Sequence, residues 1–165
     1  MRFVAPLVAV LLLVSGCSAS SVQGKQAASD RLPVVTLQPL GAGKPVDLAA
    51  LRGPLVINLW ASWCAPCRDE LPHYQAFAQK YAGKVDVLGI DFQETRPSAA
   101  RELARKSGVT YPLFEDPDGK LRAVGLPKLI LVDKDHRVTY QEYVEIKSLP
   151  QLEKLVQKHL GVTAG

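Results

Sequence analysis

Residues 58–72, "NLWASWCAPCRDELP", decide the fold of this chain. They begin inside an apolar run, residues 54–60, of the kind that forms a strand buried on both faces. Cys64 and Cys67 follow directly. Residues 65–81 then place apolar side chains three and four positions apart, a spacing typical of a helix. The sequence therefore predicts two cysteines held between a buried strand and the first turn of a helix.

Length and composition indicate one folded domain. The chain has 165 residues, of which 47% are apolar and 22% charged, and this is enough for a sizeable core and unlike the composition of a disordered chain. Its net charge of +4 is small and dispersed along the sequence. We therefore expect no nucleic-acid partner, and we expect a monomer.

The N-terminus is typical of an exported protein. Residues 1–17, "MRFVAPLVAVLLLVSGC", have one early positive charge and an apolar run that is too short to cross a bilayer but suits a signal peptide. The final "VSGC" resembles the bacterial lipobox, whose cysteine is lipidated after cleavage. We predict a lipoprotein signal peptide at 1–16 and a lipidated Cys17 with a flexible tether at 17–31. The protein would then be extracytoplasmic and lipid-anchored to the bacterial cell membrane, on its periplasmic or outer face. Ordinary cleavage near Ala19 is the alternative.

Residues 32–161 have the pattern of one α/β domain, and residues 162–165 form a short C-terminal tail. Apolar runs alternate with segments of helical periodicity in the first part, and a hairpin and a helix close the domain. This order predicts a mixed, mostly parallel sheet with helices on both faces. The predicted strands are residues 34–37, 54–60, 84–91, 111–116, 128–133 and 137–144. The predicted helices are residues 65–81, 97–106 and 149–160, with single helical turns at 48–51 and 120–124.

The cysteine pair suits one of several chemistries. A zinc site needs four ligands, but the sequence has no second such pair, and its three histidines are scattered. A c-type haem needs histidine directly after the second cysteine, where Arg68 stands. A structural disulfide between neighbours this close in sequence would stabilise the fold little. These comparisons favour a redox pair, with no metal and no bound cofactor.

The position of each cysteine predicts its role. Cys64 stands at the start of the predicted helix, where free backbone N–H groups and the helix dipole favour its thiolate, so we expect it to be the nucleophile. Cys67 lies one turn further in and is placed to attack the mixed disulfide that Cys64 forms. Pro66 lies in the first turn, where its missing N–H is tolerated, and it restricts the turn between the two sulfurs.

Two motifs, "WASWCAPCRDELP" and the downstream "GLPKLILVDKDHRV", resemble the TlpA/ResA-like membrane-anchored thiol-disulfide oxidoreductases of the thioredoxin superfamily. The resemblance covers about residues 32–160. It implies a thioredoxin-like fold, with a mixed central sheet flanked by helices. It also implies a TlpA/ResA-type central helix-strand insertion, here the helix at 97–106 and the strand at 111–116. In such proteins the first cysteine attacks and the second resolves, which agrees with the roles given to Cys64 and Cys67.

The same resemblance implies a surface that binds the client protein. The proline that opens the late strand is cis in this family and faces the dithiol, and Pro127 matches it. The Leu126 backbone would be presented there to an extended client segment. Pro72 matches the proline that bends the active-site helix. The predicted client-binding residues are Trp63, Ala65, Pro66, Leu126 and Pro127.

Several positions bear on proton transfer or depart from the family pattern. Asn58 stands where thioredoxins carry a buried aspartate, and an amide does not titrate. Glu70 lies one helical turn beyond Cys67 and matches a glutamate near the active site of ResA-like members, so we predict that it is catalytic. The alternative for Glu70 is a solvated acid favoured by the helix dipole. Lys128, where the family usually has threonine, either favours the thiolate or points to solvent. His136 is expected to serve a turn in left-handed backbone.

The resemblance implies an extracytoplasmic thiol-disulfide oxidoreductase that works by dithiol/disulfide exchange through its CAPC motif. Its expected action is the reduction of disulfides such as those of apocytochrome c, in cytochrome c maturation. Expected partners are disulfide- or thiol-bearing exported proteins, a membrane thiol-electron carrier and, through the lipid anchor, the membrane. Oxidation or isomerisation of disulfides in secreted proteins is one alternative, and a non-enzymatic copper-binding lipoprotein is another. A peroxidase is disfavoured because Ala61, not threonine, stands three residues before Cys64.

Overall fold

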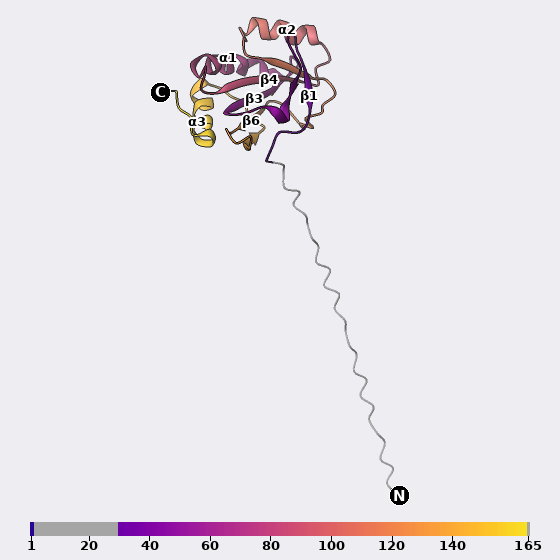
Figure 1. Cartoon of the computed structure of the whole chain (residues 1–165). Coiled ribbons are helices and arrows are strands. Elements are labelled where there is room, and N and C mark those ends of the chain that lie inside the picture. Colours follow the sequence, from indigo (N-terminus) through magenta and orange to yellow (C-terminus); the bar gives the residue numbers. More distant parts are fainter. Residues whose placement is uncertain (2–29, 165) are drawn as a thin grey trace.

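The computed structural model describes Met1 and residues 30–164. Apart from Met1, the predicted signal peptide lies outside the described residues, as do the predicted lipidation site Cys17 and most of the predicted tether. Figure 1 shows strands at the centre of the domain with α-helices beside them. Within the described part, no helix is long and apolar enough to cross a membrane. The elements are β1 (Thr36–Pro39), β2 (Val46–Asp47), the 3-10 helix η1 (Leu48–Ala50), β3 (Leu55–Trp60), α1 (Ala65–Lys80), β4 (Asp86–Phe92), α2 (Pro97–Lys106), β5 (Leu113–Asp116), β6 (Lys128–Val132), β7 (Val138–Glu142) and α3 (Leu149–Leu160).

The strands form one mixed sheet in the order β2-β1-β5-β4-β3-β6-β7. The central strands β3, β4 and β5 run parallel to one another. β1 and β2 on one side, and β6 and β7 on the other, are antiparallel to their neighbours. The prediction of a mostly parallel sheet is therefore wrong. The physical reason is that the β1–β2 and β6–β7 connections are short, whereas parallel neighbours need a long crossover.

The three α-helices lie on one face of the sheet. Val56 of β3 packs against residues of α1 and α3, and Trp60, on the same face of that strand, packs with Ala100 and Ala104 of α2. The crossovers through α1 and α2 both step in one direction, from β3 to β4 to β5, and right-handed crossovers of this kind place both helices on one side. In the part that the structure describes, η1 and the segment around Leu32 cover the other face. The prediction of helices on both faces is therefore wrong for the α-helices.

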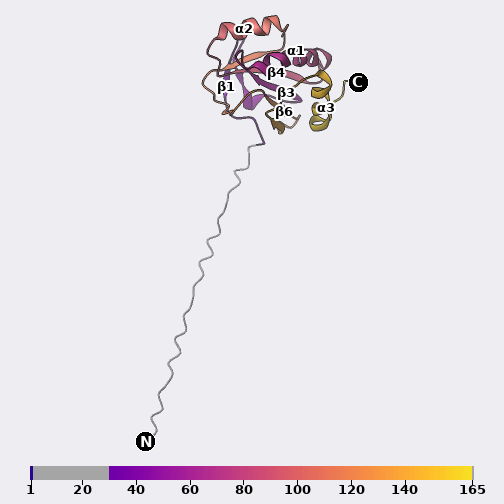
Figure 2. The ribbon, with the colours of Figure 1, turned by 180° about the vertical axis from the view of Figure 1, so that it is seen from behind.

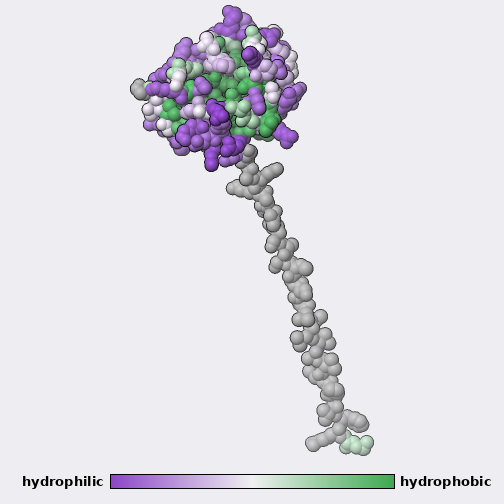
Figure 3. Space-filling view, viewed as in Figure 1, coloured by the Kyte–Doolittle hydropathy of each residue, from purple (hydrophilic) through white to green (hydrophobic). Residues whose placement is uncertain are grey.

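The domain has α3 at one side and β1 at the other, as the front and back views show (Figure 1, Figure 2). This arrangement follows from the sheet order, because α3 packs against β6 and β7 while β1 lies towards the opposite edge. On the face seen in Figure 3, hydrophobic residues gather near the middle of the domain and hydrophilic residues surround them. The segment with the two cysteines leaves the sheet between these two sides, at the carboxyl end of β3.

The predicted helices form nearly as expected, because their end signals are local. α2 has the predicted bounds, and α1 ends one residue early, at Lys80. α3 begins after Ser148, whose side chain accepts a hydrogen bond from the Gln151 N–H at 3.4 Å. It ends at Gly161, which has the left-handed φ of 69° that terminates many helices.

One predicted helical turn, at residues 120–124, does not form. The carboxylate of Asp116 accepts hydrogen bonds from the backbone N–H groups of Lys120 at 2.8 Å and Leu121 at 2.9 Å. These bonds hold the chain in a turn. The pattern analysis also missed β2, which has only two residues and pairs with β1.

Candidate active site

The two cysteines sit at the first turn of α1. Cys64 is the N-cap residue of the helix, and its sulfur is bonded to that of Cys67. Their Cα atoms are 5.3 Å apart, and the Cys64 Sγ also accepts a hydrogen bond from the Cys67 N–H at 3.3 Å. Cys64 is 5% exposed and Cys67 is fully buried. An N-cap position favours a thiolate, because unpaired N–H groups and the helix dipole stabilise negative charge there.

The residues around the pair are placed by the strand before it and the helix after it. Ala65 is exposed and Pro66 is half-buried in the first turn of α1, while Pro72 lies inside the helix. Trp63 is 49% exposed, and its indole N–H points to the Gln93 carbonyl oxygen at 3.4 Å. Trp63, which directly precedes Cys64, is therefore tied to Gln93 while about half of its residue surface is open to solvent.

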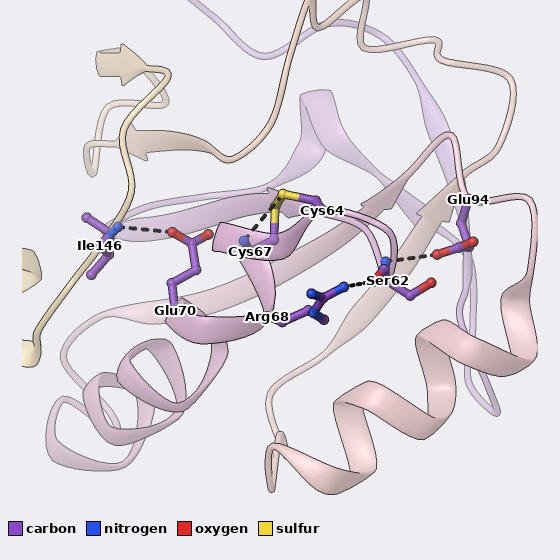
Figure 4. The surroundings of a disulfide bond; sticks show 7 residues. All are labelled: Ser62, Cys64, Cys67, Arg68, Glu70, Glu94 and Ile146. Atoms are coloured by element: carbon purple, nitrogen blue, oxygen red, sulfur yellow. Dashed lines mark hydrogen bonds between the residues drawn. A yellow bond between two sulfur atoms is a disulfide. The ribbon is translucent and has the colours of Figure 1, made fainter.

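A hydrogen-bond chain through Glu94 anchors the segment before Cys64 (Figure 4). The Ser62 N–H donates to the Glu94 carboxylate at 2.9 Å, and the Arg96 N–H donates to its other oxygen at 2.8 Å. Burial alone would raise the pKa of Glu94, but these hydrogen bonds outweigh it and the pKa is lowered. The Arg68 guanidinium donates to the Ser62 carbonyl oxygen at 3.3 Å. The site therefore holds an ionised Glu94 beneath the loop.

Sequence reasoning missed Glu94, although a signal for it exists. Glu94 follows β4, the parallel neighbour of β3. The carboxyl ends of parallel neighbours meet at one edge of a sheet, and functional side chains gather there. A polar residue just after the second parallel strand was therefore a candidate for contact with the cysteine segment.

Glu70 lies one turn beyond Cys67 and is fully buried. One carboxylate oxygen accepts a hydrogen bond from the Ile146 N–H at 3.0 Å, and Figure 4 shows the other oxygen on the side of the disulfide. Burial raises the pKa of Glu70 to about 8, against the lowering effect of the Ile146 hydrogen bond, and the charge of Glu145 raises it further. The alternative of a solvated acid is therefore wrong. Asp69, next to it, is exposed.

Asn58 is fully buried on β3, on the face that α1 covers. Neither its amide nitrogen nor its amide oxygen has a hydrogen-bond partner among the described residues, and the same holds for the Oε1 atom of Glu70. Asn58 does not titrate and so cannot accept a proton here. The buried carboxyl group of α1 is Glu70, one helical turn beyond Cys67. The geometry thus places a carboxyl with a pKa close to neutral pH next to the second cysteine.

The loop before β6 brings Pro127 to the site. The Leu126–Pro127 bond is cis, as predicted, and Leu126 packs against the cluster that contains both cysteines. The Lys128 ammonium lies 5.2 Å from the ring centroid of Tyr143, and both predicted alternatives for this side chain stay predictions. His136 has the predicted left-handed backbone, with φ of 63°.

Asp91 is, after Glu70, a second buried carboxyl group with a raised pKa, and it was not predicted from the sequence. It lies on β4, is 1% exposed, and neither carboxylate oxygen has a hydrogen-bond partner within residues 30–164. Burial raises the pKa of Asp91 to about 8, and the charges of Glu94 and Glu115 add to the effect. The folded chain therefore keeps a proton on Asp91 at pH 7.

We predict that Asp91→Asn makes the stability of the fold less sensitive to a rise in pH between about 4 and about 8. The unfolded chain releases this proton above about pH 4 and the folded chain only above about pH 8, so stability falls as pH rises between these values. Asparagine does not ionise. As pH rises across this range, the free energy of unfolding of the variant minus that of the wild type should increase by up to about 1.4 kcal/mol per pH unit.

Urea denaturation at several pH values between 4 and 8.5 measures this gain. Asp118→Asn is the matched control, because the side chain of Asp118 is 70% exposed. The control curve should run parallel to that of the wild type. Parallel curves for Asp91→Asn as well would show that Asp91 is already ionised in the folded chain.

Among the described residues, no group of three or more His, Cys, Asp or Glu side chains could hold a metal ion. Cys64 and Cys67, with the buried Glu70 one helical turn beyond, are the reactive groups that the start of α1 brings together. A dithiol that closes to a disulfide at a helix start can exchange two electrons with another disulfide or dithiol.

Comparisons with known proteins agree with this geometry. Residues 28–141 match the model of the AhpC/TSA family. The thiol-disulfide oxidoreductase ResA of Bacillus thuringiensis (strain Al Hakam) is 34% identical over 122 residues, which cover 70% of this chain and 69% of that protein. The thiol:disulfide interchange protein HelX of Rhodobacter capsulatus is 33% identical over 125 residues, which cover 72% of this chain and 66% of that protein. The chain thus spans about two thirds of the length of these relatives.

A solved structure extends the agreement to three dimensions. A DsbF homologue from Corynebacterium diphtheriae superposes with a TM-score of 0.66 and 27% identity, and the match covers 78% of this chain and 87% of that one. The predicted thioredoxin-like fold is confirmed by this match and by the family model. With the buried disulfide at the start of α1 and the identity to ResA, these findings show that the chain belongs to the AhpC/TSA family and, within it, to the ResA-like thiol-disulfide oxidoreductases.

Proposed function

We propose that this protein is an exported reductase that opens disulfides in other exported proteins, with apocytochrome c as a client. The observation that carries the proposal is the buried Glu70 behind Cys67, whose pKa is raised to about 8 by burial. A carboxyl group with a pKa in this range is suited to accept a proton near neutral pH. The resolving cysteine of a reductase must lose its proton within the buried site, and Glu70 is placed to take it.

The first step of the proposed reaction uses Cys64. Its thiolate attacks one sulfur of the client disulfide, so that a mixed disulfide forms between Cys64 and the client and one client sulfur leaves as thiolate. The N-cap position of Cys64 favours the thiolate that this attack requires. The client thiolate takes up a proton from water.

The second step uses Cys67 and Glu70. The Cys67 thiol passes its proton to the Glu70 carboxylate, and the resulting thiolate attacks the Cys64 sulfur of the mixed disulfide. The second client sulfur leaves as thiolate and is protonated. In total, one client disulfide becomes two thiols while the enzyme dithiol becomes the Cys64–Cys67 disulfide, which is the state that the structure holds.

The proposed place of work is the extracytoplasmic side of the bacterial cell membrane, on its periplasmic or outer face. A lipid on Cys17 and the tether at 17–31 would hold the domain there, and a membrane thiol-electron carrier would return the disulfide to the dithiol. Cytochrome c maturation is the proposed pathway, because the resemblance to ResA-like proteins implies apocytochrome c as client. We propose that an extended segment of the client binds at Trp63, Ala65, Pro66, Leu126 and Pro127.

The reduction potential of the purified full-length chain tests the direction of the reaction. We expect a value at or below that of thioredoxin, about −270 mV, when the chain is equilibrated in dithiol buffers and followed by Trp63 fluorescence. Cys67→Ser, which cannot close the disulfide, should show no transition and serves as the control. A value near that of DsbA, about −120 mV, would make the protein an oxidant of exported thiols.

A further inference from the structure

Four buried polar side chains between α1 and the sheet lack hydrogen-bond partners. Within residues 30–164, this holds for the Oε1 atom of Glu70, the hydroxyls of Tyr74 and Tyr111 and both amide atoms of Asn58. Asn58, Glu70 and Tyr74 are fully buried, and Tyr111 is 7% exposed. Buried polar groups in folded proteins nearly always have a partner, which is often an ordered water. Apolar packing alone does not explain why these four side chains are gathered here.

The helix places two of the four groups on one side. Cys67, Glu70 and Tyr74 are three and four positions apart on α1, so they form one stripe along the helix. Tyr74 packs in the same cluster as Val56, on the face of β3 that α1 covers. The Tyr74 hydroxyl therefore belongs to the same buried layer as the Glu70 carboxyl group.

Tyr111 enters this layer from the loop before β5. The Gly89 N–H donates to the Pro112 carbonyl oxygen at 3.0 Å and fixes the loop against β4. A Cβ atom at Gly89 would lie 3.1 Å from Cε2 of Tyr111, the ring carbon next to the one that bears the hydroxyl. Gly89 is the register partner of Asn58. The hydroxyl end of the ring therefore lies over β4 beside Asn58, where the missing side chain of Gly89 leaves room for it.

The electrostatics of the four groups agree with this placement. Burial raises the pKa of Tyr74 and of Tyr111, and in both cases the charge of Glu70 is the next cause. The Asn58 side chain opposes the effect at Tyr111. Both tyrosines therefore keep their hydroxyl hydrogens near neutral pH and remain hydrogen-bond donors. Glu145, in the segment before α3, also faces Glu70, and its charge raises the pKa of Glu70.

We propose that Asn58, Tyr74 and Tyr111 bind ordered water beside Glu70, and that the two tyrosines position this water to donate a hydrogen bond to the Glu70 carboxylate. These groups are not hydrogen-bonded to one another, so a small molecule must bridge them. A buried water typically makes about three hydrogen bonds to polar groups that have no other partner, and this cluster offers both donors and acceptors. The role of the water in the second step rests on the proposed function, whereas its binding does not.

The bound water would help Glu70 to serve as a base. The Ile146 N–H donates to one carboxylate oxygen of Glu70, and the water would donate to the other, Oε1. A hydrogen bond to the ionised form of a carboxyl group lowers its pKa. The water therefore offsets part of the effect of burial and keeps Glu70 able to ionise close to neutral pH.

Infrared titration of the oxidised full-length chain measures the ionisation of Glu70 directly. The carboxylic acid C=O band that is lost in Glu70→Gln reports on Glu70, and subtraction of that variant removes the contribution of Asp91. Tyr111→Phe removes only the hydroxyl and should move the midpoint of this band about one pH unit above that of the wild type. Tyr74→Phe should move it in the same direction. Unchanged midpoints in both variants would overturn the proposal.

Tyr81→Phe is the matched control. Tyr81 is also a buried tyrosine, 3% exposed at the C-cap of α1, but the charge that raises its pKa after burial is that of Glu153. This variant should keep the wild-type midpoint. A shift in Tyr81→Phe as large as that in Tyr111→Phe would be a general effect of losing a buried hydroxyl and would refute the water site.

A crystal structure of the oxidised chain identifies the bridging molecule. It should show ordered water within hydrogen-bond distance of Glu70 Oε1 and of at least one of the two tyrosine hydroxyls. Direct contact between a hydroxyl and the carboxylate, with no water between them, would contradict the proposed site.

The rate of the second step shows what the site does for the reaction. At pH 8, a midpoint about one pH unit higher lowers the ionised fraction of Glu70 from about a half to about a tenth, so this step should be about fivefold slower in Tyr111→Phe. The first step should keep its wild-type rate. Equal slowing of both steps would show that Tyr111 does not act through Glu70. A wild type that reduces no protein disulfide would instead refute the proposed function, while the infrared midpoints would still decide on the water site.

Discussion

Cys67→Ser should stop the reaction after its first step and leave the client covalently attached to Cys64. The physical reason is that Cys64 remains at the N-cap of α1 and still attacks, but the buried position that should resolve the mixed disulfide carries a hydroxyl. We expect a complex of enzyme and client that survives denaturation and disappears with excess dithiol. Turnover of a protein disulfide should fall to the uncatalysed background. Non-reducing gel electrophoresis and mass spectrometry of the complex measure the outcome.

Cys64→Ser is the control for this experiment. It removes the N-cap nucleophile and keeps the fully buried Cys67, so it should form no complex with the client. The contrary pattern, with trapping by Cys64→Ser and none by Cys67→Ser, would exchange the roles of the two cysteines. Sustained turnover by Cys67→Ser would show that the client itself supplies the resolving thiol, and the proposed second step would then be wrong.

Glu70→Gln should slow the second step by roughly 100-fold at pH 8, a typical contribution of a positioned general base. Glutamine has the same size, and its side-chain oxygen is able to accept the hydrogen bond from the Ile146 N–H, so the fold should be kept. Because the first step does not involve Glu70, the mixed disulfide should accumulate in single-turnover experiments. Rapid quenching with acid and separation of the trapped species measures its rise and decay.

The pH dependence of the second step tests the same role of Glu70. Glu70 accepts a proton only when it is ionised, and its pKa is raised to about 8 by burial. The rate of the second step in the wild type should therefore increase as pH rises from 6 to 9, with a midpoint near 8. In Glu70→Gln that midpoint should disappear. A midpoint that persists in Glu70→Gln would assign the titration to another group.

Asp69→Asn is the matched control for Glu70→Gln. Asp69 is the neighbouring acid, but it is exposed. The control should reproduce the wild-type rate and midpoint. If both variants lose activity to the same degree, the effect comes from the net charge of the first turns of α1 and not from the buried carboxyl group.

The raised pKa values of the buried carboxyl groups have a cost for the folded chain. The pKa values of both Glu70 and Asp91 are raised to about 8 by burial, so each holds a proton in the fold that the unfolded chain has lost above its ordinary pKa. Stability should therefore fall as pH rises from about 4 to about 8, and Glu70→Gln should remove part of this slope, as Asp91→Asn does. A buried carboxyl group that serves as a base near neutral pH therefore lowers the stability of the fold in that pH range.

Much of the local structure was predictable from the sequence because its causes are local. The position of Cys64 before a helix, the bounds of α2 and the caps of α3 at Ser148 and Gly161 depend on residues within one turn of each other. The cis bond at Pro127 and the sulfur pair were expected from short motifs. The errors were of another kind. The direction of the outer strands and the side on which the helices pack depend on how distant segments meet.

The candidate site likewise combines local features that the sequence predicts with contacts between distant positions that it does not predict. Glu70 was expected one turn from Cys67, but the group that donates a hydrogen bond to its buried carboxylate is the Ile146 N–H, 76 positions further along the chain. Glu94 reaches Ser62 across 32 positions, and Tyr143 reaches Val124 across 19. No spacing rule within the motif predicts these contacts.

The sequence by itself determined the identity of the redox pair and the order of α1, α2 and α3. These features follow from helix periodicity, capping and motif spacing, which act between near neighbours in the chain. Only the tertiary structure decided that Glu70 and Asp91 are buried away from bulk solvent, that Glu94 stays ionised beneath the cysteine segment and that Tyr143 supports the loop before Pro127. The physical reason is that the charge state and orientation of a side chain are set by everything packed around it, and folding brings those groups together from distant positions.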